Sequence, residues 1–264
     1  MNNAVENKYK IIAEHLLNAE QDVREISKIT NEYTDITQNI AYSIQEKLLE
    51  QRLKNNNTVK IGAKLGLTSK AKQDMMGVNE AIIGDLHADM LTYEWEPLDC
   101  TYLIHPKTEP EIAFYIDKDI QGDNITEKDI LKATKYIAPA LEVIDSRYKD
   151  FTFNLADVIA DNCSSKKFVV GSKLTLPHSV DLSNIGVVMS KNGNVEQTGS
   201  SAAVLGHPLK AMAWAANELD RRGKSLKKGD IILSGAISEA IKIESGDTIV
   251  AEFHHLGSVS LSCK

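Results

Sequence analysis

The sequence lacks the short patterns that mark several common classes of enzyme. It contains no Gly-x-Gly-x-x-Gly, no P-loop, no Gly-x-Ser-x-Gly and no zinc-ligand spacing. A nucleotide-binding, serine-hydrolase or zinc-dependent function therefore loses its usual support. Internal repeats and low-complexity linkers are absent as well, so the 264 residues are expected to form one large domain or two modest ones.

Cysteine is scarce, and no long hydrophobic run occurs. Cys100, Cys163 and Cys263 are odd in number and widely spaced, which fits a reducing compartment better than a disulfide framework. No stretch approaches the length that spans a membrane, and the first residues mix Glu and Lys where a signal peptide has a continuous apolar core. We therefore predict a cytoplasmic protein with no membrane partner.

An excess of basic residues is also missing. The formal net charge is −7, with 42% hydrophobic and 25% charged residues. This balance is typical of a globular protein and argues against a nucleic-acid partner, although a local basic pocket for a small anion remains open.

The N-terminal segment has helical periodicity. Apolar residues recur at helical spacing over residues 6–20, and a second helix is predicted from the N-cap Thr37 through Leu53, ending in the polar run 55–57. After residue 57, short apolar runs alternate with Gly, Asn and Asp, which is typical of strands with a few inserted helices. The sequence therefore predicts a helical lobe over 1–57 and a mostly β domain over 58–264.

Two local patterns lead to further structural expectations. Thr126 and Asp129 resemble a capping box, which predicts a helix to about Ile137, before Pro139. Three potential metal ligands, Asp85, His87 and Asp89, follow a Gly84 turn, and we interpret them as loop residues.

Three glutamates lie inside or beside apolar segments. Glu109 and Glu111 alternate in a predicted strand and would project from the same face, while Glu142 lies in the apolar run ALEVI. A buried carboxylate without a partner is costly, and a shared Mg²⁺ or Mn²⁺ ion would remove that cost. The alternative from spacing alone is a solvated strand face.

Other candidates each have a structural alternative. Lys64, between Gly62 and Gly66, would point into a confined site or lie on the surface. Ser164 and Ser165 could donate hydrogen bonds to an anion or belong to a turn. His207 begins a helix at Pro208 and would face an active site or cap that helix.

The chain resembles the hydratase and decarboxylase family of aromatic meta-cleavage pathways, within the fumarylacetoacetate hydrolase superfamily. The matching stretches are GAKLGLTSKA, HPKTEPEIAF, PALEVIDSRY, ADNCSS, NGNVEQTGSSAAVLGHP, GDIILSG and LGSVS. The resemblance implies an α+β, mostly β fold, the fumarylacetoacetase C-terminal-like β-roll, behind the N-terminal helical lobe. It also implies a Mg²⁺ or Mn²⁺ ion on Glu109, Glu111 and Glu142, with Lys64 as the catalytic residue. The substrate-binding residues expected are Lys64, Leu67, Ser164, Ser165 and His207.

The family contains two activities, and this sequence is more similar to the decarboxylases. Hydratases carry an Asp two residues before the glycine that is Gly84 here, and this chain has Ile82, which cannot handle a proton. The segments LIHPK, DSRYKDFTF and ADNCSS also resemble decarboxylases. The expected reaction is decarboxylation of 2-oxo-3-hexenedioate (4-oxalocrotonate) to 2-hydroxypenta-2,4-dienoate and CO₂. The alternative is a hydratase that converts 2-hydroxypenta-2,4-dienoate to 4-hydroxy-2-oxopentanoate.

The resemblance also sets expectations about partners. The substrate would be a small unsaturated 2-oxo diacid, and the expected protein partners are further copies of the chain and a paralogous hydratase. A non-catalytic assembly subunit is disfavoured because Lys64 and all three glutamates are present. A carbon–carbon bond hydrolase is disfavoured because His105 is the nearest candidate base and its Pro-Lys context matches the decarboxylases.

Overall fold

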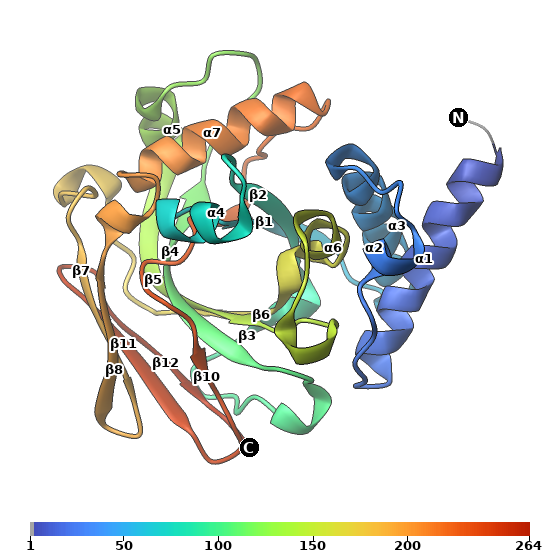
Figure 1. Ribbon diagram of the computed structural model, residues 1–264. Helices are drawn as coiled ribbons and strands as arrows, with labels where there is room; N and C mark the ends of the chain where they lie inside the picture. The colour runs from blue at the N-terminus through green and yellow to red at the C-terminus, as the bar shows by residue number, and fades with distance from the viewer. Residues whose placement is uncertain (1–2) are drawn as a thin grey trace.

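The computed structural model describes residues 3–264; residues 1–2, which begin the predicted lobe, lie outside the described residues. Figure 1 shows the N-terminal helices beside a strand-rich body. The α-helices are α1 (Asn3–Gln21), α2 (Ile29–Glu32), α3 (Gln38–Asn56), α4 (Lys70–Met76), α5 (Glu127–Ala133), α6 (Leu155–Ala160) and α7 (Pro208–Arg221). The strands are β1 (Lys60–Gly66), β2 (Ile82–His87), β3 (Leu91–Thr92), β4 (Lys107–Ile116), β5 (Thr134–Ile144), β6 (Ser165–Val170), β7 (Gly186–Lys191), β8 (Asn194–Ser200), β9 (Ile231–Leu233), β10 (Ile241–Lys242), β11 (Thr248–Phe253) and β12 (Gly257–Ser262).

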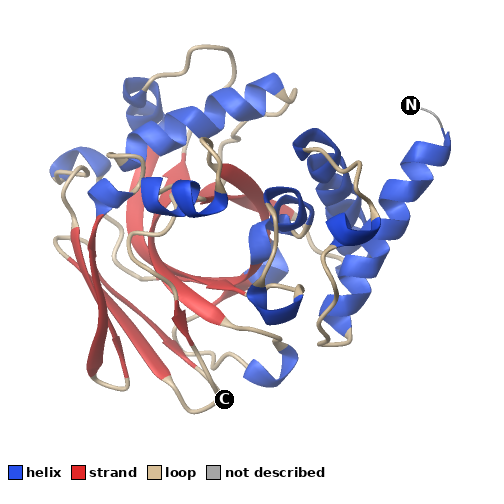
Figure 2. Ribbon diagram, viewed as in Figure 1, coloured by secondary structure: helices blue, strands red, loops and turns tan. Residues whose placement is uncertain are grey.

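The strands form two sheets. The larger sheet has the order β2-β1-β9-β4-β5-β6-β3, with β10 also paired to β4, and the smaller sheet has the order β12-β11-β7-β8. Figure 2 shows the larger sheet curled into a roll, with the smaller sheet packed on one side. The expectation of a mostly β, rolled fold with an N-terminal helical lobe is confirmed.

Two main hydrophobic clusters hold these layers together. The larger cluster joins both sheets and α7, with Phe114, Leu141, Ile249 and Met212 among its members. The second cluster joins α1 and α3 to α6 and also contains Ile82. Because the core of the helical lobe extends into β2, the proposed boundary at residue 57 stays a prediction.

Local capping explains where several helices begin and end. Thr37 Oγ1 accepts from the Ile40 backbone N–H at the start of α3, and Asn57 ends that helix in the left-handed conformation. Ser69 caps α4 by accepting from the Lys72 backbone N–H. The cap expected at Thr37 is therefore present.

The predicted end of the helix after Thr126 is wrong. The capping box forms, but α5 ends at Ala133 and β5 begins at Thr134. Pairing with β4 along this segment outweighs the local helical pattern, and the strand even contains Pro139, whose carbonyl accepts from the Gly171 backbone N–H. The interpretation of Asp85 and His87 as loop residues is also wrong, because both lie in β2.

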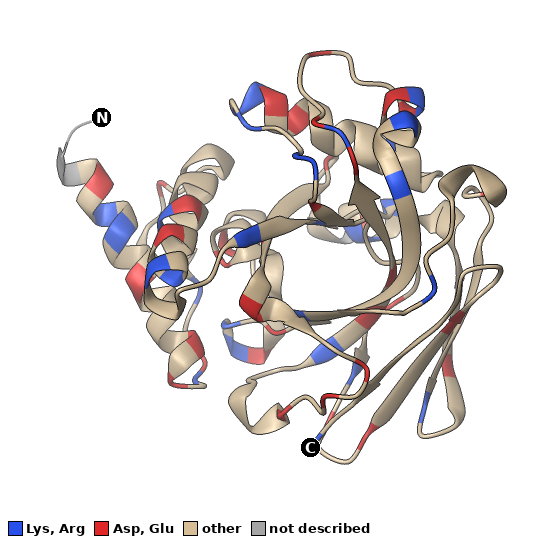
Figure 3. Cartoon of the chain, turned by 180° about the vertical axis from the view of Figure 1, so that it is seen from behind, with Lys and Arg blue, Asp and Glu red and all other residues tan. Residues whose placement is uncertain are grey.

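Charges of both signs occur along the two long N-terminal helices. Figure 3 shows acidic and basic positions interspersed along α1 and α3, and Lys47 of α3 pairs with Glu6 of α1. Within residues 3–264, none of the helices combines the length and the apolar character that crossing a bilayer requires.

Candidate metal centre

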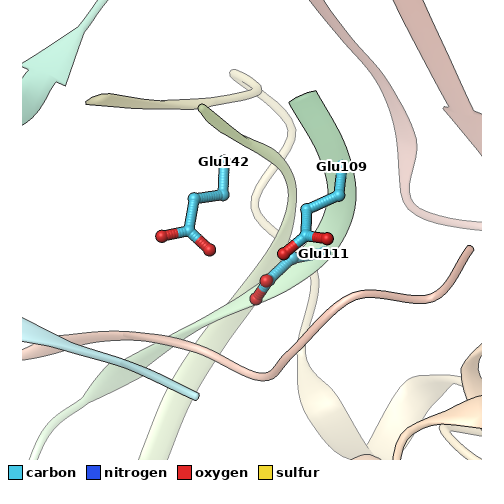
Figure 4. Close-up of side chains that lie close together, drawn as sticks. All are labelled: Glu109, Glu111 and Glu142. Carbon is cyan, nitrogen blue, oxygen red and sulfur yellow. The ribbon is translucent and has the colours of Figure 1, made fainter. Parts of the chain in front are cut away.

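Two neighbouring strands place the three predicted carboxylates on one face of the larger sheet. Glu109 and Glu111 are two residues apart in β4, and Glu109 lies directly opposite Glu142 of β5. Carboxylate oxygens of all three residues lie within 4.8 Å of one another. Figure 4 shows the three side chains converging on a common space. All three are buried, so the alternative of a solvated strand face does not hold.

Hydrogen bonds from two other segments orient the carboxylates. The Gly235 backbone N–H donates to Glu111 Oε2 at 2.6 Å, and Ser165 Oγ donates to Glu142 Oε1 at 2.9 Å. Gly235 has a φ of +103°, and a Cβ at this position would lie 2.1 Å from Thr68 Oγ1. Only glycine therefore allows the backbone to approach Glu111 in this way.

Two lysines neutralise part of the negative charge. Lys72 Nζ of α4 donates to Glu109 Oε2 at 2.9 Å. Lys64 Nζ of β1 lies 3.0 Å from Glu142 Oε2 and donates to the Cys163 backbone carbonyl at 3.3 Å. Burial acts to raise the pKa of Glu109, but Lys72 and Lys64 hold that pKa below its usual value.

Glu111 lacks such a cationic partner among the described residues. Its burial, and then the charges of Glu142 and Glu109, raise the pKa of Glu111 well above its usual value. Burial also raises the pKa of Glu142, in spite of the nearby Lys64 ammonium. Three ionised carboxylates would therefore carry more negative charge than Lys64 and Lys72 balance, and the pKa values of Glu111 and Glu142 rise for this reason.

The donor set fits a divalent cation. Among residues 3–264, none donates a hydrogen bond to the buried Glu111 Oε1, and Glu142 Oε2 has only the ion pair with Lys64 as a polar contact. Three carboxylates supply the hard oxygen ligands that Mg²⁺ and Mn²⁺ prefer, and they leave coordination positions for water or substrate. The three glutamates can thus hold a metal ion.

Close packing of β1 directs Lys64 toward this cluster. A Cβ at Gly62 would lie 1.8 Å from the Ile231 carbonyl oxygen, so the parallel pairing of β1 with β9 requires glycine there. Lys64 follows Gly62 by two residues in β1, so both project from the same face of the strand, and Lys64 is 2% exposed. Burial acts to lower the pKa of Lys64, but Glu142 and the other nearby carboxylates raise it above its usual value, so the ammonium is charged.

A cavity of about 610 Å³ adjoins Lys64 and Glu109. Its large apolar side chains come from β2, β5, α4, α6, the 149–153 segment and the residue after β1, and they are Leu67, Met76, Ile82, Ile144, Phe151, Phe153 and Val158. Its charged lining consists of Lys64, Lys72, Lys107, Glu109 and Glu239. A mostly apolar cavity with a few convergent cations suits a small organic anion.

The residues predicted to bind substrate occupy different positions. Leu67 and Ser164 line the cavity, and the buried Ser164 Oγ has no hydrogen-bond partner in the part of the chain that the structure describes. Ser165 does not line it and instead supports Glu142. His207 is the N-cap of α7, where its Nδ1 accepts from the Leu209 backbone N–H at 3.0 Å, and the structure does not bring it to the cavity.

Sequence reasoning missed two lysines of this site. Lys107 precedes Glu109 by two residues in β4, so the same alternation that relates the glutamates could have identified it. Lys72 carries no such signal, because its position depends on how α4 packs against the sheet.

Residues 75–262 match the family model for the C-terminal domain of fumarylacetoacetate (FAA) hydrolase. The chain belongs to the fumarylacetoacetate hydrolase family. Within that family it is 41% identical over 249 residues to the 4-oxalocrotonate decarboxylase of Pseudomonas putida, covering 94% of each chain. It is 37% identical over 251 residues to the 2-hydroxyhexa-2,4-dienoate hydratase of Comamonas testosteroni, again covering 94% of each chain.

Solved structures agree with this family membership. The 4-oxalocrotonate decarboxylase of Pseudomonas putida G7, complexed with magnesium and adipate, superposes with a TM-score of 0.94 at 39% identity, covering 98% of each chain. The resemblance to the decarboxylases and hydratases, and the expectation of a fumarylacetoacetase-like fold, are both confirmed.

Proposed function

We propose that this protein is a lyase that decarboxylates 4-oxalocrotonate to 2-hydroxypenta-2,4-dienoate and CO₂, in the catabolism of aromatic compounds by meta cleavage. The metal ligands in this proposal are Glu109, Glu111 and Glu142, and the ion is Mg²⁺ or Mn²⁺. The observation that carries the proposal is the buried trio of carboxylates beside a charged Lys64, next to a cavity with an apolar wall.

The reaction needs positive charge at one end of the substrate. When the C5–C6 bond breaks, its electron pair becomes the C4=C5 double bond, and negative charge moves through C3 to the C2 oxygen, which then takes a proton. A bound Mg²⁺ would supply Lewis acidity at that oxygen. The Lys64 ammonium is held by Glu142 and the Cys163 carbonyl, so it is a second, fixed cation at this centre. It needs no covalent bond to the substrate.

The cavity wall favours decarboxylation over hydration. Ile82 is 2% exposed and lines the cavity, and its side chain packs closely enough that a Cβ on Gly66 would lie 2.9 Å from Ile82 Cγ1. An apolar group at this position excludes water and offers no base to activate it. Hydration of 2-hydroxypenta-2,4-dienoate is the second candidate, supported by the identity with hydratases.

Lys64, Leu67 and Ser164 are the residues we propose to contact substrate, because all three line the cavity. Ser165 is proposed to orient Glu142. We do not extend the proposal to His207, whose ring caps α7.

Product analysis with two substrates tests the proposed function. The Mg²⁺-loaded protein should convert 4-oxalocrotonate to the dienoate with release of CO₂ and leave 2-hydroxypenta-2,4-dienoate unchanged. Formation of 4-hydroxy-2-oxopentanoate from the dienoate, without loss of CO₂ from the dioate, would establish the hydratase instead.

We further propose a helical lobe over 1–57 and a catalytic domain over 58–264, a cytoplasmic location, and assembly with copies of the chain and with a paralogous hydratase. The family resemblance supports these points. Light scattering of the protein alone and mixed with such a hydratase measures the assembly, and a monomeric mass in both samples would refute it.

A further inference from the structure

Lys107 lies one step along β4 from the carboxylate cluster. It precedes Glu109 by two residues and pairs across the strands with Ile144, and both Lys107 and Ile144 line the cavity. Residues two apart on a strand project from the same face and are separated by about 7 Å. The Lys107 side chain therefore extends into the cavity that Glu109 also lines, beside the Phe151 ring.

Lys107 differs from the other two cavity lysines in its partners. Lys64 pairs with Glu142 and Lys72 with Glu109. Within residues 3–264, no carboxylate lies within ion-pair distance of Lys107, and its Nζ lies 4.2 Å from the centroid of the Phe151 ring.

The surroundings of Lys107 supply no anion from the adjacent strand either. Its cross-strand neighbour on β10 is a second lysine, Lys242, which pairs with Glu244. Lys107 is half-buried, so a carboxylate that enters the cavity would meet a partly desolvated cation against an aromatic ring.

We propose that Lys107 binds the distal carboxylate of a dicarboxylate substrate whose 2-oxo acid end occupies the Glu109–Glu111–Glu142 centre. This inference deepens the proposed function and rests on it for the identity of the dioate. The two sites lie on one strand face, and the apolar side chains of Ile144 and Phe151 would cover the carbon chain between them.

The direction of charge flow defines what Lys107 contributes. During decarboxylation, negative charge leaves the distal carboxylate and moves to the C2 oxygen, so an interaction with the distal carboxylate is stronger in the ground state than in the transition state. Lys107 therefore acts as a binding and specificity residue, and its removal should raise KM without lowering kcat.

Equilibrium binding of two unreactive ligands tests the proposal independently of turnover. The ligands 2-oxoadipate and 2-oxohexanoate have the same chain length and the same 2-oxo acid end, and only the first has a distal carboxylate. Neither has the double bond that decarboxylation requires. Calorimetry of the Mg²⁺-loaded protein should show a preference for 2-oxoadipate of about 10- to 100-fold.

Substitution of Lys107 should remove this preference. In Lys107→Met, which keeps an unbranched apolar stem against Phe151, the two affinities should differ by less than about threefold. Lys107→Arg should restore the preference. The matched control is Lys135→Met, which removes an exposed strand lysine whose Nζ lies over the Tyr136 ring, and it should bind as wild type.

Several results would overturn the assignment. The first is a wild-type protein that shows no preference for 2-oxoadipate over 2-oxohexanoate. The others are an undiminished preference in Lys107→Met and an equal loss of affinity for both ligands in that variant. In kinetics with 4-oxalocrotonate, a fall in kcat at constant KM in Lys107→Met would also refute it. Failure of the proposed function is a separate result, namely wild-type protein that prefers 2-oxoadipate and releases no CO₂ from 4-oxalocrotonate.

Discussion

Replacing Glu111 with glutamine should change thermal stability in opposite directions with and without a divalent cation. Glu111 is fully buried beside Glu109 and Glu142, and its pKa is raised well above the usual value by burial and by those two charges. Glutamine has nearly the same shape, can still accept from the Gly235 N–H, and carries no charge. Without metal, the variant should be more stable by about 1–3 kcal/mol at pH 8.

The pH dependence of this difference has a defined sign. A carboxyl group whose folded-state pKa is raised stabilises the fold fully below its unfolded value near 4.5, and this contribution is lost as the pH rises through the folded-state pKa. The metal-free wild-type protein should therefore lose stability relative to Glu111→Gln as the pH rises from about 4.5 toward 8.

Addition of Mg²⁺ should reverse the ranking. A ligand at about 1,000 times its Kd stabilises the native state by about 4.1 kcal/mol, which for a chain of this size corresponds to about 8–16 °C in Tm. Glu111→Gln loses one of three carboxylate ligands, so the same Mg²⁺ concentration should raise its Tm by less than about 2 °C.

Thermal denaturation with excess EDTA and with Mg²⁺ measures both effects. The matched control is Glu239→Gln, since Glu239 also lines the cavity and is exposed, and this variant should behave as wild type in both buffers. A lower Tm of Glu111→Gln in EDTA, or an undiminished Mg²⁺ shift, would refute the assignment of Glu111 as a metal ligand.

Three further predictions follow from the same contacts. Lys64→Met, assayed with saturating Mg²⁺, should keep the native circular dichroism spectrum and lose about 10²–10³-fold in kcat; near-normal kcat would leave Lys64 without a catalytic role. Ile82→Asp should lower decarboxylation and introduce hydration of 2-hydroxypenta-2,4-dienoate, with Ile82→Leu as the control; decarboxylation at wild-type rate without hydration would show that Ile82 does not decide between the reactions. Burial acts against the charged form of Glu20, but Arg52 and Lys166 lower its pKa from 4.5 to about 2, so its contribution of about 3 kcal/mol is present above pH 4.5 and lost as the pH falls toward 2. Urea denaturation of Glu20→Gln should show a deficit at pH 7 that shrinks below pH 4.5, and a deficit independent of pH would contradict the assignment.

The sequence identified candidate site residues where the site depends on residues near one another along one strand. The alternation of Glu109 and Glu111 and the apolar context of Glu142 identified the three carboxylates as candidates, but spacing alone left a solvated strand face open, and the family resemblance was needed to choose the buried cluster that the structure shows. The glycines that flank Lys64 likewise indicated a confined site. These features are local, so the periodicity of a strand carries them.

The sequence was insufficient where pairing or packing between distant segments decides the outcome. The helix predicted to reach Ile137 gives way to β5 because residues 134–144 pair with β4. The role of Lys72 depends on where α4 docks, and the approach of the Gly235 amide to Glu111 depends on the turn after β9. His207 illustrates the same limit, since the sequence predicted the helix start but could not decide between a role in the active site and the capping role that the structure shows.

The most direct test of the proposed metal-dependent decarboxylation is the release of CO₂ from 4-oxalocrotonate by the purified chain. Release is measured with Mg²⁺, then with excess chelator, and again after Mg²⁺ is restored. We predict rapid release with Mg²⁺, loss of release in the chelator and recovery on restoring the ion. Release that continues unchanged after thorough chelation, or no release under any of the three conditions, would contradict it.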